Sequence, residues 1–247
     1  MTAGLSVFPV RNSMGQERKR PYQRTGNEGT ISGTVSFVGR VPPSVRIDKT
    51  ADSVCARINW YGRTEQFVVN GGRFANVLVY VKSARILDEL TFEPPRTPVI
   101  IDQRGCTFIP HVAGAMAEQA IEFRNSDPTP QNVHPTPKMN SEWNRSLVTS
   151  GTAFTTRFPH SEVAIPIKDN QHPWKKVYLG VFAHPFFSVS NKNGMFRIEG
   201  LPPGKYVIAA WHEQLGEQTS EATVLSNSAT IVNFSFRLPQ YRDIPAR

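Results

Sequence analysis

Apolar and polar residues alternate in short segments along most of the chain. Over residues 31–37, Ile31, Val35 and Phe37 alternate with small or polar positions. This predicts a half-buried strand, because successive side chains of a strand point to opposite faces. Residues 76–82 are apolar enough to predict a central strand. The other predicted strands are residues 99–102, 119–125, 153–158, 162–167, 177–182, 205–212, 222–225 and 229–236. Their length and spacing are typical of a β-sandwich.

The local turn signals agree with this class of fold. Asn193-Gly194 separates two apolar segments, residues 187–189 and 196–198. Asn-Gly accepts the positive φ angles of a two-residue turn, so we expect a hairpin here. No segment repeats apolar residues at helical spacing, apart from a short turn over residues 84–90. The 20 prolines and 17 glycines suit short strands joined by tight turns. We therefore predict an all-β protein.

The first 28 residues differ from the rest of the chain. They carry five basic residues against two acidic ones and few β-branched residues, so residues 1–28 are expected to be a basic, extended arm without its own core. Ordering such an arm requires contacts from elsewhere, which a partner surface would supply. The residues expected to bind that partner are Phe8, Val10, Arg18, Lys19, Arg20 and Tyr22. At the other end, residues 241–247 are assigned to a tail.

The net charge of +8 is compatible with an acidic protein surface, anionic lipid headgroups, or ordinary solubility charge. We expect no nucleic-acid partner, because the chain has no aromatic-and-basic RNA motif, zinc-finger spacing or helical reading element. No stretch approaches the roughly 20 apolar residues of a membrane-spanning helix. The apolar run near the start is too short for a signal-peptide core, which by itself favours the cytosol.

The two cysteines, Cys55 and Cys106, are separated by fifty other residues. They can form one disulfide or remain a pair of buried thiols, and they cannot build a structural zinc site unaided. The sequence leaves both alternatives open.

Two segments resemble the carboxypeptidase regulatory-like, or transthyretin-like, β-sandwich. They are GTISGTVSFVGRVPP, starting at Gly29, and NGMFRIEGLPPGKYVIAAWHE, starting at Asn193; NVLVYVKSA would add a further strand. The resemblance implies a discontinuous sandwich over residues 29–92 and 184–240, with a second domain inserted over residues 93–183. Such insertions are tolerated where the ends of the inserted part lie close together.

The inserted part resembles the bacterial plastocyanin-like cupredoxins that combine both modules. The matching segments are IDQRGCTFIPHV, IEFRNSDPTPQNVHPTP and HSEVAIPIKDNQHPWKKVYLGVFAHPFF. The fold implied is a cupredoxin-like Greek-key barrel inserted into a transthyretin-like β-sandwich. Within it, Cys106 is expected to precede the first strand of the insert, and Cys55 to belong to the outer sandwich.

The resemblance also implies where a blue-copper site would lie. Such a site uses two imidazoles, a thiolate and a weak axial thioether. The first imidazole follows the Asn-Ser-Asp turn, where this chain has Gln131. The thiolate precedes the histidine of His-Pro-Trp by three residues, where it has Asp169. The second imidazole matches His172, and the axial methionine is replaced by Lys175. We therefore expect a degenerate site that holds no copper and no other cofactor.

Weaker candidates for chemistry remain. His111, His134 and His172 with Asp169 could hold a harder metal, although we favour hydrogen-bonding roles in former ligand loops. His212-Glu213 lacks a partner placed by motif, which favours a structural pair over a catalytic one.

Taken together, these features predict a non-catalytic accessory or scaffold subunit. The usual company of cupredoxin-like proteins implies the periplasmic or extracytoplasmic face of a bacterial membrane complex, with other subunits of an electron-transfer or photosynthetic complex as partners. That location conflicts with the short apolar run at the start.

One alternative is a metal-binding redox or carrier protein with a rearranged site. Another is a carbohydrate- or surface-binding module that uses the four tryptophans as a platform. These are Trp60, Trp143, Trp174 and Trp211.

Overall fold

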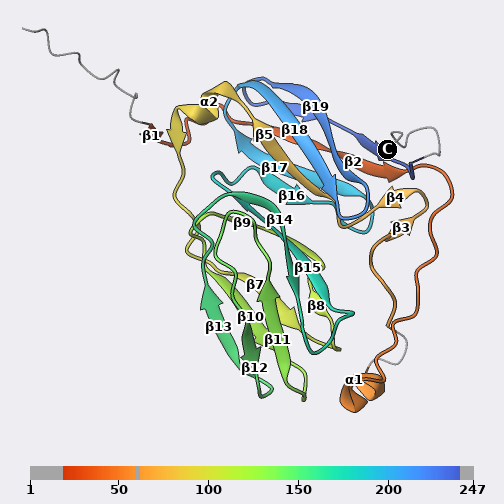
Figure 1. Cartoon of the computed structure of the whole chain (residues 1–247). Coiled ribbons are helices and arrows are strands. Elements are labelled where there is room, and N and C mark those ends of the chain that lie inside the picture. The colour runs from red at the N-terminus through yellow and green to blue at the C-terminus, as the bar shows by residue number, and fades with distance from the viewer. Residues whose placement is uncertain (1–18, 59–61, 240–247) are drawn as a thin grey trace, which may run out of the picture.

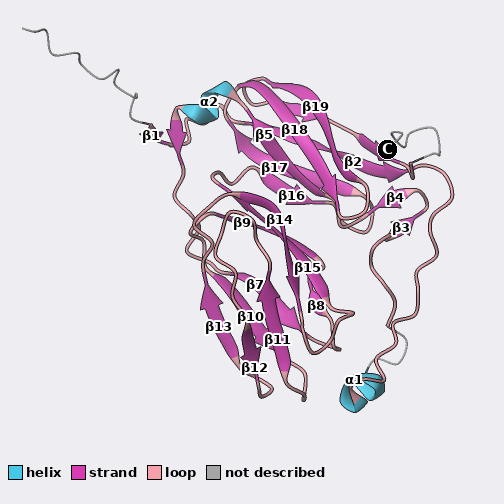
Figure 2. Ribbon diagram, in the orientation of Figure 1, coloured by secondary structure: helices cyan, strands magenta, loops and turns pink. Residues whose placement is uncertain are grey.

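The computed structural model describes residues 19–58 and 62–239. Strands make up nearly all of the regular structure, and the described part contains two short helices (Figure 2). The strands form two β-sandwiches that lie one above the other in Figure 1. The predicted all-β class is confirmed. Among the described helices, none has the length and apolar character needed to cross a membrane.

The upper unit in Figure 1 is built from both ends of the chain, and we call it the outer sandwich. Its apolar core lies between two sheets, with Ile31, Phe74 and Ile208 fully buried. One sheet contains, in order, β16 (Phe187–Val189), β5 (Leu78–Ser83), β18 (Gly204–His212) and β19 (Gly216–Val224). The other contains β17 (Met195–Leu201), β2 (Gly29–Phe37), β4 (Arg73–Phe74) and β3 (Val69–Asn70), with β20 (Ala229–Ile231) and β21 (Phe234–Phe236) parallel to β2.

The lower unit, which we call the insert, is a Greek-key β-sandwich formed by β7 to β15. Its own core includes the fully buried Phe123, Val133 and Ile165. One sheet has the order β13 (Ala153–Thr156), β10 (Ile121–Asn125), β7 (Val99–Gln103) and β8 (Phe108–Ile109). The other has the order β12 (Arg145–Leu147), β11 (Gln131–Pro135), β14 (Glu162–Lys168), β15 (Lys176–Phe182) and β9 (Val112–Met116).

A third apolar cluster joins the two units. It combines Leu78 and Ala209 of the outer sandwich with Phe182 of the insert. Gly114 and Gly180 are register partners on β9 and β15, and a Cβ added to either would lie 2.5–2.6 Å from Phe187 or Leu78. The glycines therefore allow the two units to approach closely, and the apolar contact fixes their arrangement.

The last residues of the predicted arm pack against the outer sandwich of the same chain. β1 (Arg20–Pro21) pairs with β6 (Leu90–Thr91), next to helix α2 (Arg85–Asp88). The Tyr22 ring lies 5.0 Å from the Phe92 ring between centroids, and its hydroxyl donates a hydrogen bond to the carbonyl of Gly200 at 2.8 Å.

The structure therefore corrects the expectation that Tyr22 anchors a partner, because its apolar surface is already used by the outer sandwich. Lys19 and Arg20 are exposed. Phe8, Val10 and Arg18 lie outside the described residues.

The hairpin expected around Asn193-Gly194 is wrong in its strand pairing. A tight turn is present, and Gly194 has a φ of +69°. A side chain there would also collide with the carbonyl of Val35, 2.4 Å from a built Cβ. However, β16 pairs with β5 while β17 pairs with β2. The turn carries the chain from one sheet of the sandwich to the other, which the local sequence signal cannot distinguish from a hairpin.

A long connection between β2 and β3 reaches from the outer sandwich to the insert (Figure 1). Its described parts, residues 38–58 and 62–68, are called the strap. Arg46 and Arg63 form a β-bridge between its two limbs. At its tip lies helix α1 (Ser53–Ile58), whose one buried side chain is Cys55. The strap brings residues of the first part of the chain to loops at one end of the insert.

Two histidines of the outer sandwich, the buried His212 and the half-buried His184, predict an acid-sensitive fold. Burial lowers the pKa of both His184 and His212 to about 4, whereas the unfolded value is about 6.5. At pH values between these two pKa values, the unfolded chain therefore binds more protons than the folded chain. The stabilisation is therefore complete above a pH of about 6.5 and is lost as the pH falls towards 4, by up to about 1.4 kcal/mol per pH unit for each histidine.

Urea unfolding at several pH values tests this dependence. His184→Gln should flatten the slope, and His160→Gln, which changes an exposed histidine, should leave it unchanged. A wild-type stability that stays constant between pH 6.5 and pH 4 would contradict the prediction.

Candidate functional site

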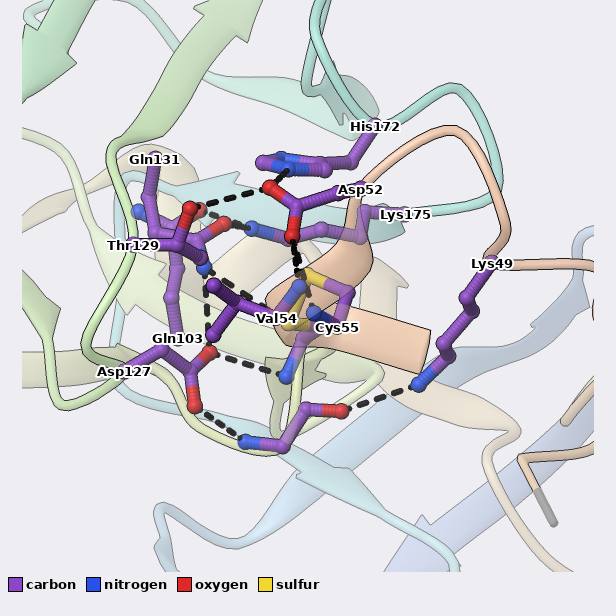
Figure 3. Close-up of a disulfide and its surroundings, with 12 residues drawn as sticks. Lys49, Asp52, Val54, Cys55, Gln103, Asp127, Thr129, Gln131, His172 and Lys175 are labelled. Atoms are coloured by element: carbon purple, nitrogen blue, oxygen red, sulfur yellow. Dashed lines mark hydrogen bonds and ion pairs between the residues drawn. A yellow bond between two sulfur atoms is a disulfide. The ribbon is translucent and has the colours of Figure 1, made fainter. Parts of the chain in front are cut away.

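A buried network of charged and polar side chains lies where the strap meets the insert (Figure 3). The insert contributes the loop after β7, the loop between β10 and β11, and the loop between β14 and β15. The strap contributes the tip that carries α1. The residues of the network are Lys49, Asp52, Cys55, Gln103, Cys106, Asp127, Thr129, Gln131, Asp169, His172 and Lys175.

The ammonium group of Lys175 is at the centre of this network. The side chain is fully buried, and Nζ donates hydrogen bonds to Gln103 Oε1, Gln131 Oε1 and Asp169 Oδ2. It also lies 4.7 Å from the centroid of the Phe108 ring, an arrangement that attracts a cation to the face of the ring. A fixed positive charge thus has three oxygen acceptors and an aromatic face around it.

Asp169 compensates this charge. Its carboxylate accepts hydrogen bonds from the backbone N–H groups of Asn132, Gln171 and His172 at 2.8–3.0 Å. Burial raises the pKa of Asp169, but the hydrogen bond from His172 and the charge of Lys175 outweigh it and hold the pKa at about 2. Burial lowers the pKa of Lys175 to about 8, against the opposing effect of Asp169. Both groups are therefore ionised at neutral pH.

His172 links this ion pair to the strap. Its Nδ1 lies 3.0 Å from Asp169 Oδ2, and its Nε2 lies 3.2 Å from Asp52 Oδ2. Burial opposes protonation, but the two carboxylates raise the pKa of His172 above its usual value. Both ring nitrogens face carboxylates, so the protonated ring donates a hydrogen bond to each of them.

Asp52 has two separate roles. Its Oδ1 accepts hydrogen bonds from the N–H groups of Val54 and Cys55 at 2.7 and 2.9 Å, so it caps the start of α1. Its Oδ2 accepts a hydrogen bond from the Thr129 hydroxyl at 2.9 Å, in addition to the contact with His172. Lys49 donates a further bond to the carbonyl of Gly105 at 2.9 Å. The helix is thereby fixed to two loops of the insert.

A disulfide between Cys55 and Cys106 closes the contact between strap and insert. Cys106 lies after β7, not before the first strand of the insert as expected, and contacts Gln131 at 3.9 Å. Asp127 holds this turn by accepting hydrogen bonds from the N–H groups of Gly105 and Cys106 and from Gln131 Nε2. Both cysteines therefore lie directly beside the predicted copper positions.

The structure brings all four predicted copper positions together. Lys175 donates hydrogen bonds to both Gln131 and Asp169, and His172 joins them through Asp169. The donor set does not fit blue copper, since no thiolate occupies the position and a protonated amine fills its centre. Gln103 Nε2, a buried atom without a hydrogen-bond partner among the described residues, is an N–H donor and not a metal ligand.

We therefore expect the purified protein, incubated with Cu²⁺, to show no intense thiolate-to-copper absorption. The combined change Gln131→His, Asp169→Cys and Lys175→Met restores the imidazole, thiolate and thioether at these positions and should produce that absorption. A blue colour in the unmodified protein would show that the residues have been assigned to the wrong ligand positions.

The other predicted histidines do not join this site. His111 Nε2 pairs with Glu213, and the His111 ring packs edge-on against Tyr178. His134 bonds Asn170 at 3.0 Å and Glu142 at 2.6 Å. The hypothesis that His111, His134, His172 and Asp169 share a metal is therefore corrected. Within the described residues, the one group whose ligand atoms converge is Asp52, Cys55 and His172.

Two further sequence hypotheses are resolved by packing. His212 and Glu213 point to different partners, because the His212 ring lies 4.5 Å from the Phe74 ring between centroids while Glu213 binds His111. The described tryptophans form no common platform. Trp143 packs against the insert core and Trp211 against the junction of the two units, while Trp174 donates to the carbonyl of Cys106. Trp60 lies outside the described residues.

Sequence reasoning missed the contribution of the strap. Lys49, Asp52 and Asp127 carry no metal motif, and Asp52 contacts His172 across 120 positions of sequence. One local signal was present: Asp52 precedes Ser53-Val54-Cys55, and aspartate is a favoured first residue before a helix.

Comparisons with known proteins find likeness in solved structures alone. No protein-family model matches the chain, and neither does any curated protein. A copper-containing nitrite reductase from Thermus scotoductus SA-01 matches with 14% identity and a TM-score of 0.33, covering 60% of this chain. The chain spans 28% of the length of that enzyme.

Two further solved structures match over nearly their whole length. Amicyanin from Paracoccus versutus has 14% identity and a TM-score of 0.32, covering 42% of this chain and 96% of amicyanin. A purple cupredoxin from Nitrosopumilus maritimus has 17% identity and a TM-score of 0.29, covering 34% of this chain and 98% of the cupredoxin. At such scores the fold assignment rests on the strand pairing described above.

Proposed function

We propose that the chain is a non-catalytic accessory or scaffold subunit on the extracytoplasmic face of a bacterial membrane complex. The observation that carries the proposal is the Lys175 ammonium. It occupies the centre of the predicted copper site and is held by Gln103, Gln131 and Asp169. The insert thus keeps a rigid β-sandwich, with an internal ion pair where a cupredoxin would hold its metal.

Two further observations support the proposal. The Cys55–Cys106 disulfide suits a protein that folds in an oxidising compartment. The apolar cluster and the strap connect the two units at separate places, as suits a subunit that holds other proteins at a fixed spacing. The choice of an electron-transfer or photosynthetic complex as the host follows from the cupredoxin resemblance alone.

The proposal is tested by purifying the tagged full chain from the membranes of its host in mild detergent. We expect membrane subunits to co-purify in a fixed ratio. Charge-neutralising changes at the exposed end of the arm, Lys19→Gln with Arg20→Gln, should weaken this association, most visibly as salt rises. The matched control is Lys138→Gln with Lys192→Gln, which removes two exposed charges elsewhere.

Each alternative function has its own signature in this experiment. If the chain is released from the membrane fraction without other proteins and binds a polysaccharide, the result would favour the surface-binding module. A chain that carries a redox-active metal at one equivalent would favour the carrier protein. Either result would contradict the scaffold role.

A further inference from the structure

The cluster formed by Asp52, Cys55 and His172 has the composition of a metal site. One ligand atom from each lies within 4.8 Å of the others, and Cys106 Sγ is bonded to Cys55 Sγ. In the oxidised protein, the two sulfurs are bonded to each other. Metal ions bind the thiolate form of cysteine, so these sulfurs are not available as ligands until the disulfide is reduced. The cluster therefore differs from a metal site by the state of one covalent bond.

We propose that reduction of the Cys55–Cys106 disulfide converts this cluster into a binding site for Zn²⁺. Two sulfurs, one imidazole nitrogen and one carboxylate oxygen make four ligands of the types that zinc takes in tetrahedral sites. This site shares His172 with the predicted copper positions, but its other three ligands lie outside them, and the centre of those positions remains occupied by Lys175. The ligands are Cys55 Sγ, Cys106 Sγ, His172 Nε2 and Asp52 Oδ2.

The sulfurs are held in place by contacts other than the disulfide. On the insert side, Asp127 accepts the N–H groups of Gly105 and Cys106 at 2.6 and 2.8 Å. On the strap side, Asp52 caps the helix at Cys55 N and binds Thr129 across the interface. These bonds do not depend on the oxidation state of sulfur. The two thiols are therefore expected to stay adjacent after reduction.

His172 is oriented as a metal ligand requires. Its Nδ1 contacts the buried carboxylate of Asp169 at 3.0 Å, and its Nε2 points to Asp52. A carboxylate on the far nitrogen is the usual outer partner of a zinc-binding histidine, because it fixes the ring and the tautomer. Here that partner is itself held by three backbone N–H groups.

The surrounding charge favours a divalent cation once the thiols lose their protons. The carboxylates of Asp52, Asp127 and Asp169 would then face two thiolates, and the compensating side chains are Lys49 and Lys175. The negative groups outnumber the positive ones. A bound Zn²⁺ reduces this imbalance.

The chemistry balances with a dithiol as the reductant. Two electrons and two protons pass from the dithiol to the S–S bond, which breaks to give two thiols while the dithiol closes to a cyclic disulfide. Zn²⁺ then displaces the two thiol protons and the proton on His172 Nε2, and all three pass to solvent. Asp52 binds as the carboxylate that it already is.

The test uses the full chain with Co²⁺ as a spectroscopic substitute for Zn²⁺. The disulfide is reduced with a phosphine in urea, the urea is removed without oxygen, and two free thiols per chain are verified. We expect one equivalent of Co²⁺ to give the visible bands of a tetrahedral site and a thiolate charge-transfer band, and Zn²⁺ to abolish both. The oxidised protein should give neither.

Substitutions identify the ligands. Asp52→Asn keeps an oxygen for the helix cap. A double variant that combines Asp52→Asn with His172→Gln should bind Co²⁺ about tenfold more weakly or worse. His134→Gln, at a histidine bonded outside the cluster, should bind as the wild type does. If the reduced chain loses its fold, added Zn²⁺ should restore the native circular dichroism spectrum.

The inference fails if the reduced chain takes up no Co²⁺ and Zn²⁺ does not restore a lost fold. It also fails if the oxidised protein binds equally well, or if His172→Gln leaves the spectrum unchanged. None of these outcomes bears on co-purification with membrane subunits, so the proposed function stands or falls separately.

Discussion

Replacing Lys175 with methionine should lower the free energy of unfolding by about 3–5 kcal/mol. Asp169 is fully buried and would lose the partner that balances its charge, while Gln103 and Gln131 would lose the donor to their oxygens. The hydrogen bonds from His172 and three backbone N–H groups remain, so the loss should lie towards the lower end of that range. Urea unfolding at neutral pH measures the change.

The neighbouring Lys176 supplies a matched control. It is exposed, so Lys176→Met should change the stability by no more than about 0.5 kcal/mol. Adding Asp169→Asn to Lys175→Met removes the uncompensated charge, and the double variant should lose less than the sum of the two single changes. Strict additivity, or a stable Lys175→Met protein, would mean that the ion pair contributes little to the fold.

Removing the disulfide should cost about 4 kcal/mol on the chain-entropy account, because the bond closes a loop of about 50 residues. The change is Cys55→Ser with Cys106→Ser, and its effect is measured as the shift in the urea midpoint and slope. We expect the insert and the outer sandwich to remain folded, since each keeps its own apolar core.

The control for this prediction is the wild type under reducing conditions. It should show the same loss of stability as the double serine variant, because both release the same loop. If both proteins lose less than about 1 kcal/mol of stability, the contacts of Asp52 and Lys49 would have to keep the strap close to the insert in the unfolded chain as well. A loss in the serine variant alone would point to the added hydroxyl groups.

The strands that the sequence predicted are those with a clear alternation of apolar residues. Residues 31–37 became part of β2 and residues 162–167 part of β14. In contrast, β11 (Gln131–Pro135) is polar and ends in proline, so nothing in its composition predicts a strand. Its pairing with β12 and β14 holds it in place, and such pairing is a tertiary effect.

The site was predictable where it depended on loops within the insert. Gln131, Asp169, His172 and Lys175 were located by resemblance to the ligand loops of cupredoxins, and they do meet. The role of Lys175 as the centre of a hydrogen-bonded network was not predictable, because its acceptor Gln103 lies 72 positions away. The strap was missed for a similar reason: helix α1 has six residues, which is too short to show an apolar period.

The disulfide also has a topological consequence. Cys55 belongs to a connection of the outer sandwich and Cys106 to the insert, while the polypeptide passes between the two units through residues 92–98, much of which is exposed. The chain crosses between the units a second time from β15 to β16, so the S–S bond is a third covalent route between the same bodies. A protease that cuts the linker opens a ring without dividing the molecule, so a nicked protein remains one covalent species until a reductant is present.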